Sequence, residues 1–288
     1  MILFTKDVFK HFFDSNTFQK GAALAYYTVF SLLPMIIIIT SILGIIFGKQ
    51  AVTGEIYSQL KNILGADASL QIQTIIKNQH TNHNSVLTST IGFITLAFSA
   101  SGIFSQIHNS FNTIWNIKEK PKSSILKYLS KHIISFLILI GLFFIILIST
   151  TVTSFLIKHS NNLHSDYKFY YLYEHLISFV VLGIIFALMF KFLGDAKVHW
   201  KATILGGLFT ALLFGFGKIG IGMYIGHSHI SSTFGSASVL AILMLWVYYT
   251  SQILFLGASF VKIISNVLGC KIIPNNNAVK AEKIDLNN

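Results

Sequence analysis

Charged residues are scarce in this chain and absent from long stretches of it. Asp, Glu, Lys and Arg make up 11% of its 288 residues, whereas a soluble domain carries about 25%. The longest uncharged stretch runs from Ile219 to Val261, and others cover 21–48, 81–117, 132–157, 175–190 and 202–217. A helix needs about 20 apolar residues to cross a bilayer. The repeated pattern excludes a water-soluble domain and indicates a polytopic membrane protein.

The chain also has only one cysteine and no arginine. The single cysteine, Cys270, excludes a disulfide framework and any multi-cysteine metal site. Without arginine, no bidentate fork is available for a phosphate or carboxylate. The 10 acidic residues form no visible cluster with histidines, so we expect no metal, no cofactor and no enzymatic activity. A phosphate-binding loop is missing too, because Leu212 and Ile219 replace its first glycine and its Ser/Thr around Gly217-Lys218.

The apolar stretches predict an all-α domain over residues 22–264. Its six transmembrane helices are expected at 22–48, 86–110, 133–157, 175–193, 203–226 and 237–263. A short amphipathic helix is expected within 1–21, with apolar Ile2, Leu3, Phe9, Phe12 and Phe13 on one side. A second one is expected in the first external loop, 49–85. The polar segment 265–288 is expected to be a disordered cytoplasmic tail.

The lysines fix the expected orientation. Most of them fall in residues 1–21, in the second and fourth connections and in the tail, so the positive-inside rule places both termini in the cytoplasm. The net charge of +11 follows from this asymmetry, and the scattered lysines argue against nucleic acid as a partner. The densest group is expected to contact anionic lipid headgroups: Lys118, Lys120, Lys122, Lys127 and Lys131.

Polar residues inside the spans are the candidates for function. Tyr27, Ser31 and Pro34 share a face of the first span, and Pro34 should kink it. Gln106, Asn109 and Asn112 lie towards the cytoplasmic end of the second span. Buried amides need hydrogen-bond partners, so each set either joins helices or lines a cavity or cytoplasmic gate.

Lys218 is the one formal charge well inside a span. An ammonium group is costly at membrane depth. It can snorkel to the external interface, or it can face a cavity and contact an anion. His227 and His229 form an HxH pair, but the residues that follow do not continue a metal-site pattern.

Four blocks of sequence resemble the YihY/BrkB family of bacterial membrane proteins. They are Ala22–Pro34, Ser101–Trp115, Val198–Gly207 and Phe234–Ala258. The last block contributes Trp246 and Tyr248 to the candidate cavity residues. The chain departs from the family pattern at Gly194, where Pro is common, at Phe234, where Tyr is usual, and at Ser259, where Glu is frequent.

The resemblance implies a six-helix protein of the bacterial inner membrane. We expect a secondary transporter or exporter of an anionic solute or lipid-linked molecule. Membrane lipids are its expected partners, and a homo-oligomer is an open alternative to a monomer. The alternative is a non-transporting envelope scaffold. The ribonuclease label once given to the family does not fit, because metal-assisted phosphodiester cleavage needs clustered carboxylate and imidazole ligands.

Overall fold

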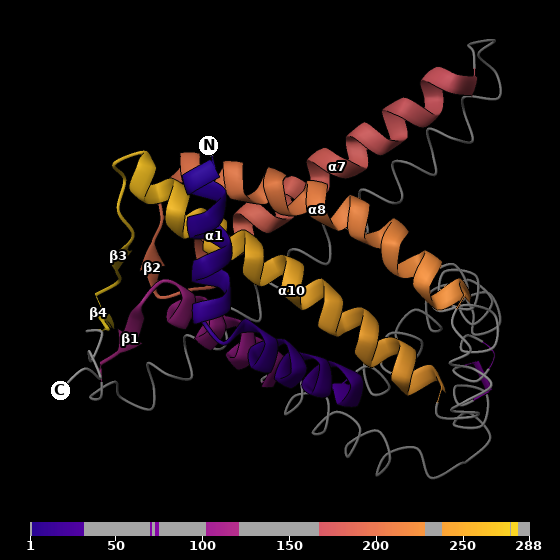
Figure 1. Cartoon of the computed structure of the whole chain (residues 1–288), viewed down its shortest axis with the longest axis horizontal. Coiled ribbons are helices and arrows are strands. Elements are labelled where there is room, and N and C mark those ends of the chain that lie inside the picture. Colours follow the sequence, from indigo (N-terminus) through magenta and orange to yellow (C-terminus); the bar gives the residue numbers. More distant parts are fainter. Residues whose placement is uncertain are drawn as a thin grey trace, which may run out of the picture. The chain divides into compact units, whose positions relative to one another are not determined.

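The computed structural model describes residues 2–31, 70, 73–74, 102–120, 167–227, 238–276 and 278–281. Its labelled helices are α1 (Ile2–Asp14), α7 (Tyr167–Phe192), α8 (Trp200–His227) and α10 (Ser238–Val267). Residues 17–31 and 102–114 are helical as well. Four short strands accompany them: β1 (Ile117–Glu119), β2 (Ala196–Lys197), β3 (Ile273–Pro274) and β4 (Ala278–Lys280) (Figure 1). The described part of the fold is therefore mostly helical, and its four short strands depart from the predicted all-α fold.

The chain forms two compact units. The first contains residues 1–18, 104–216 and 252–288, and the second contains 19–103 and 217–251. Each of the helices α8 and α10 therefore has one part in the first unit and the other part in the second unit. The predicted spans 22–48 and 86–110 are described only in part. The predicted span 133–157 and almost all of the loop 49–85 lie outside the described residues.

Two described helical stretches are long and apolar enough to cross a membrane, Trp200–Ile221 and Leu240–Val267. A shorter apolar stretch is Leu176–Phe192. Only 33% and 39% of the two longer stretches are buried, whereas the central helix of a soluble protein would be mostly covered. Their apolar side chains therefore fit contact with lipid better than contact with water.

Close packing joins α7, α8 and α10 within the first unit. The rings of Phe209 and Phe260 stack with their centroids 4.2 Å apart. A Cβ added at Gly207 would meet the Gly183 carbonyl oxygen and would lie 2.7 Å from the Ala187 backbone nitrogen. The small residues of α8 thus let helix backbones approach, as is common where apolar helices pack in membranes.

The N-terminal region is helical but differs from the expected amphipathic helix. Helix α1 ends at Asp14, and Asn16, with φ 51°, separates it from the helical segment 17–31. Val8 and Phe12 are buried, whereas Leu3, Phe9 and Phe13 are more than half exposed. The spacing of four residues places Val8 with Phe12 on a face that packs, while the exposed apolar side chains leave the contact of this helix with the membrane interface a prediction.

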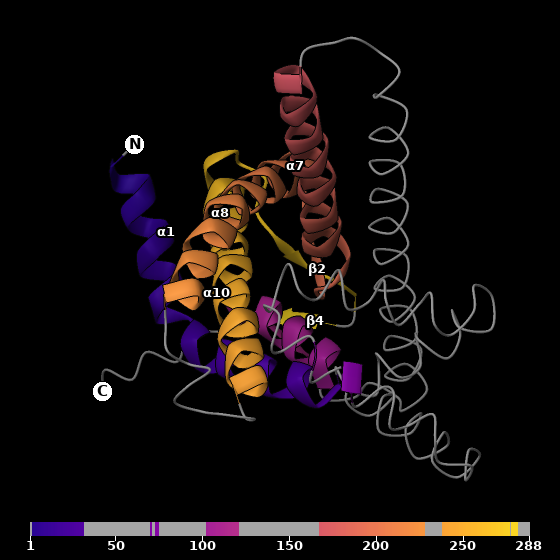
Figure 2. The same cartoon turned by 90° about the vertical axis from the view of Figure 1, so that its right-hand side faces the viewer.

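The tail is the clearest correction. Helix α10 continues to Val267 and ends in a left-handed glycine, Gly269, with φ 68°. β4 then pairs with β1 and β3 pairs with β2, both antiparallel. The prediction of a disordered tail is wrong for residues 265–276 and 278–281, because polarity alone does not reveal partners that lie far away in the sequence. Figure 2 shows the strands from the side, with β2 directly after the end of α7.

Candidate functional site

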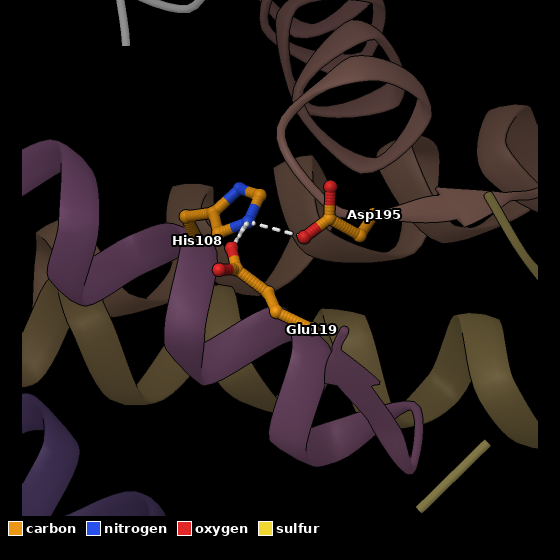
Figure 3. Close-up of side chains that lie close together, drawn as sticks. All are labelled: His108, Glu119 and Asp195. Carbon is orange, nitrogen blue, oxygen red and sulfur yellow. Dashed lines mark hydrogen bonds and ion pairs between the residues drawn. The ribbon is translucent and has the colours of Figure 1, made fainter. Parts of the chain in front are cut away.

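A group of titratable side chains lies where the helical segment 102–114, β1 and the bend before β2 meet in the first unit. His108 Nε2 is 2.8 Å from Asp195 Oδ2 and 3.5 Å from Glu119 Oε1 (Figure 3). His108 and Asp195 are only 5% and 6% exposed, while the Glu119 side chain retains 39% exposure. We call His108, Glu119 and Asp195 the histidine–carboxylate cluster.

Local chain geometry brings Glu119 back towards His108. The helical segment 102–114 is followed by Asn116, whose φ of 56° is a left-handed conformation that asparagine tolerates at helix ends. Its backbone N–H donates to the Thr113 carbonyl oxygen (3.0 Å). The chain then turns directly into β1, whose last residue is Glu119.

A second turn supplies Asp195. Helix α7 ends at Phe192, and the short bend 193–195 leads into β2. The missing side chain of Gly194 leaves room for the Trp115 ring, since an added Cβ would lie 3.0 Å or less from two of its atoms. Trp115 is 1% exposed, and its Nε1–H donates to the Ala258 carbonyl oxygen (3.1 Å). The indole thus forms the apolar floor beneath the bend.

The tail fixes the backbone around both carboxylates. In the β1–β4 pair, Glu119 stands opposite Ala278. The Asn275 backbone N–H donates to the Asp195 carbonyl oxygen (2.8 Å). Because these contacts join residues far apart in sequence, both carboxylates depend on the tail for their positions.

Hydrogen bonds orient the two buried side chains of the cluster. His108 Nδ1 lies 2.6 Å from the Leu193 carbonyl oxygen. Asn112 accepts from the Asp195 backbone N–H (2.9 Å) and donates from Nδ2 to Asp195 Oδ2 (3.0 Å). The Asn112 amide oxygen and nitrogen are therefore distinguished by their partners.

The arrangement brings together atoms that mostly accept hydrogen bonds. A carbonyl oxygen only accepts, so the hydrogen of Nδ1 points at Leu193 and leaves Nε2 facing Asp195 and Glu119. Carboxylate oxygens also only accept when they are ionised. A buried contact of acceptors is unfavourable, and the Asn112 Nδ2 amide, 3.0 Å from Nε2, supplies one donor to it; a shared proton or a metal ion can supply the rest.

Sequence reasoning identified part of this site and missed the rest. Asn112 was a candidate, and the structure joins it to His108, which lies in the same polar stretch. Glu119 and Asp195 were missed, and the statement that no acidic residue clusters with a histidine was wrong. The signal available in the sequence was the position of these two acidic residues. Each lies shortly after an apolar stretch, in a chain with few acidic residues.

Other candidates in the first unit behave differently. Asn109 is exposed while Asn112 is 5% exposed, so the two asparagines do not share one environment. Gln106 is half-buried, and its backbone carbonyl oxygen accepts a hydrogen bond from Ser110 Oγ (2.6 Å). Lys118 and Lys120 are exposed, and Lys120 Nζ donates to the Asn276 carbonyl oxygen (2.9 Å). Pro34, Lys122, Lys127 and Lys131 lie outside the described residues.

The candidates of the second unit do not form a described cluster. Ser31 is buried, and its hydroxyl donates to the Thr28 carbonyl oxygen (2.9 Å). Tyr27 covers Gly102, where an added Cβ would lie 2.6 Å from its ring. Trp246 and Tyr248 are half-buried on α10, and Lys218 is exposed on α8. The transport role of these residues stays a prediction.

A groove of about 440 Å³ lies apart from the cluster, between α1 and α10. It is lined by acidic, basic and apolar side chains without an evident common chemistry: Asp7, Lys10, His11, Asp14, Ile263, Asn266 and Val267. None of the three cluster residues lines it. Size alone therefore does not make it the better candidate.

Comparison with known proteins identifies the family. The family described as "Virulence factor BrkB" matches residues 8–280. This chain belongs to the BrkB family. The resemblance noted from the four sequence blocks is thereby confirmed.

Several similar curated proteins are named membrane proteins. A UPF0761 membrane protein of Psychrobacter sp. strain PRwf-1 is 26% identical over 88% of this chain and 47% of its own length. Those of Pseudomonas paraeruginosa and Saccharophagus degradans are 25% and 23% identical over 90% of this chain, and over 62% and 59% of their own lengths. The chain therefore spans about half to three fifths of these relatives. No solved structure matches it.

Proposed function

We propose that this chain is the six-helix membrane domain of a secondary transporter in the bacterial inner membrane. Both termini face the cytoplasm, and the cargo is an anionic solute or a lipid-linked anion. The observation that carries the proposal is Lys218, an exposed cation within the apolar stretch Trp200–Ile221. Because a charge at membrane depth is costly, its retention favours contact with an anion.

The surroundings of Lys218 support a mobile or open region. Gly215 and Gly220 flank it on α8, and an added Cβ at either meets nothing within 4 Å among the described residues. Glycine lowers helix stability when no close packing compensates for it. A glycine-rich helix around a cation fits the interrupted helices that line binding sites in carriers.

The flux test uses the full chain in proteoliposomes. The probes are radiolabelled organic anions and a fluorescent anionic phospholipid, each assayed with wild type, Lys218→Gln and Lys201→Gln. Lys201 is an exposed lysine in the first turn of the same helix, so it controls for loss of charge. We expect Lys218→Gln alone to lower flux. Equal flux in all three removes Lys218 from the mechanism, and no flux of any probe argues against a transporter.

The proposed orientation has its own test, because Cys270 is the single native cysteine. It follows α10 and is half-buried. We expect a membrane-impermeant maleimide to label it in inverted vesicles and not in intact spheroplasts. An Asn78→Cys substitution in a Cys270→Ser background should give the opposite pattern, since residue 78 is expected outside. Labelling of both positions from the same side would refute the topology.

An envelope scaffold is the second candidate. The close packing of Gly207 against the backbone of α7 favours it, since a rigid bundle suits a structural role. A scaffold predicts a stable partner after mild crosslinking and solubilisation, with no flux in the liposome assay.

A further inference from the structure

The cluster of His108, Glu119 and Asp195 combines one imidazole with two carboxylates. We propose that it binds a divalent transition-metal ion of the zinc class through His108 Nε2, Asp195 Oδ2 and Glu119 Oε1. The three ligand atoms lie within 4.8 Å of one another. They come from the helical segment 102–114, from β1 and from the bend before β2, and all belong to the first unit.

The orientation of His108 is the first argument. Its Nδ1–H is taken by the Leu193 carbonyl oxygen at 2.6 Å, which leaves the Nε2 lone pair directed at the two carboxylates. Metal-binding histidines typically donate their other ring N–H to a carbonyl or carboxylate in this way. The imidazole is thus held in the tautomer and the direction that a metal ion needs.

Asp195 is held in a similar manner. Its carboxylate Oδ2 accepts from Asn112 Nδ2 at 3.0 Å, and its backbone N–H donates to Asn112 Oδ1 at 2.9 Å. Asn112 Nδ2 also lies 3.0 Å from His108 Nε2. This amide therefore holds Asp195 as an outer partner of a metal site does, whereas its contact with Nε2 has to give way when a metal ion takes the Nε2 lone pair.

The distances suit an ion of this size. Nitrogen and oxygen ligands about 2.1 Å from a tetrahedral zinc ion lie roughly 3.4 Å from each other. The observed Nε2–Oε1 distance is 3.5 Å. The Nε2–Oδ2 distance of 2.8 Å must widen by about 0.6 Å, which a small rotation of the Asp195 side chain provides.

The ligand types narrow the choice of ion. Imidazole suits Zn²⁺ and Fe²⁺, whereas carboxylates alone favour Mg²⁺, Ca²⁺ and Mn²⁺. A site with one nitrogen and two oxygen ligands lies between these preferences, so Zn²⁺ is the ion tested first and Mg²⁺ is the comparison. With three protein ligands, the fourth position is left for water or a ligand oxygen. The partly exposed Glu119 side chain gives access from solvent.

The first experiment measures metal in the full chain, purified in detergent without chelators. We expect about one zinc ion per chain by mass spectrometry, in line with one complete ligand set. Titration with Zn²⁺ against a chromophoric chelator then gives the affinity, with Mg²⁺ as the comparison ion. Size-exclusion profiles and unfolding temperatures report whether each variant is folded.

Three substitutions separate ligands from their neighbours. Glu119→Gln should lose most of the zinc affinity while keeping the fold, because Glu119 is partly exposed. Asn112→Ala, an outer partner, should weaken binding by about 10–100-fold. His199→Gln is the control, since His199 is an exposed histidine before α8, and it should bind like wild type.

The rival occupant of the cluster is a proton, which would make His108 an imidazolium paired with Asp195. In that case the purified protein retains no zinc, does not compete with the chelator, and its unfolding temperature does not respond to Zn²⁺. That result overturns the proposal. So does equal zinc affinity in wild type and Glu119→Gln, which would place the ion elsewhere. These readouts do not depend on transport, so failure of the flux assay leaves them unaffected.

Discussion

The two parts of α8 contain similar residue types but are packed differently. In the first part, up to Phe216, Gly207 lies against the backbone of α7, and Ala202, Thr203 and Thr210 are fully buried. In the second part, Ile219, Met223 and Tyr224 are more than half exposed, and Gly220 has no close neighbour among the described residues. Glycine content alone therefore does not reveal whether a membrane helix is tightly packed or open.

The strongest test of this contrast compares two glycines of α8. Gly207→Ala should lower the free energy of unfolding by about 2–3 kcal/mol, because the added methyl group meets backbone atoms that cannot rotate away. Gly220→Ala, in the open second part, should raise it by up to about 1 kcal/mol, because alanine is the better helix former and an added Cβ there meets nothing within 4 Å among the described residues. Denaturant titration in detergent micelles measures both. Equal effects would mean that the two parts of the helix are packed alike.

A second comparison concerns two asparagines of the segment 102–114. Asn112→Ala should cost about 1–3 kcal/mol, because it leaves the buried Asp195 carboxylate and N–H without their amide partner. Asn109 is exposed, so Asn109→Ala should change the free energy of unfolding by less than about 0.5 kcal/mol. The same titration measures both, and a large effect of Asn109→Ala would contradict the described orientation of this segment.

A third comparison concerns two tryptophans: Trp115, which packs beneath the bend that carries Asp195, and the exposed Trp200. Trp115→Phe should cost about 1 kcal/mol, because the buried Ala258 carbonyl oxygen loses the indole N–H. Trp200 is 47% exposed, so Trp200→Phe should have little effect. Thermal unfolding followed by fluorescence size-exclusion measures both variants. A larger loss for Trp200→Phe would show that the exposed ring is covered by another part of the protein.

The smallest effect on stability is expected in the open part of α8. Lys218→Gln should change the free energy of unfolding by less than about 0.5 kcal/mol, as is usual for exposed side chains. The same variant is expected to lower flux, so stability and transport would separate. A marked gain in stability without any change in flux would instead indicate that Lys218 only snorkels to the interface.

Much of the helical architecture could be predicted from the sequence. The predicted spans 203–226 and 237–263 coincide with α8 and most of α10, because the need to satisfy the backbone in lipid leaves a long apolar stretch few alternatives. The end of α10 was placed too early, since Ile264 to Val267 continue the helix after Lys262. Charge alone therefore marks the boundary of a membrane helix less well than its capping residue.

The cluster could not be predicted in the same way. His108 and Asn112 are four residues apart and stood out as polar residues in an apolar span. Asp195 joins them across more than eighty positions of sequence, and only the turn after α7 brings it there. Glu119 depends on the left-handed Asn116 and on pairing with β4. Such contacts are set by folding, and a single sequence contains no periodic signal for them.

The left-handed Gly269 has a consequence for how the molecule is made. The Cys270 N–H donates to the Ser265 carbonyl oxygen, and the Gly269 N–H donates to that of Asn266, a helix ending that reverses the chain. β3 and β4 follow this reversal, so both leave the ribosome after their partners β2 and β1. The β2–β3 pair cannot close until synthesis has passed Pro274, and the β1–β4 pair cannot close until it has passed Lys280. Backbone pairing at β1 and β2 therefore follows the synthesis of α10.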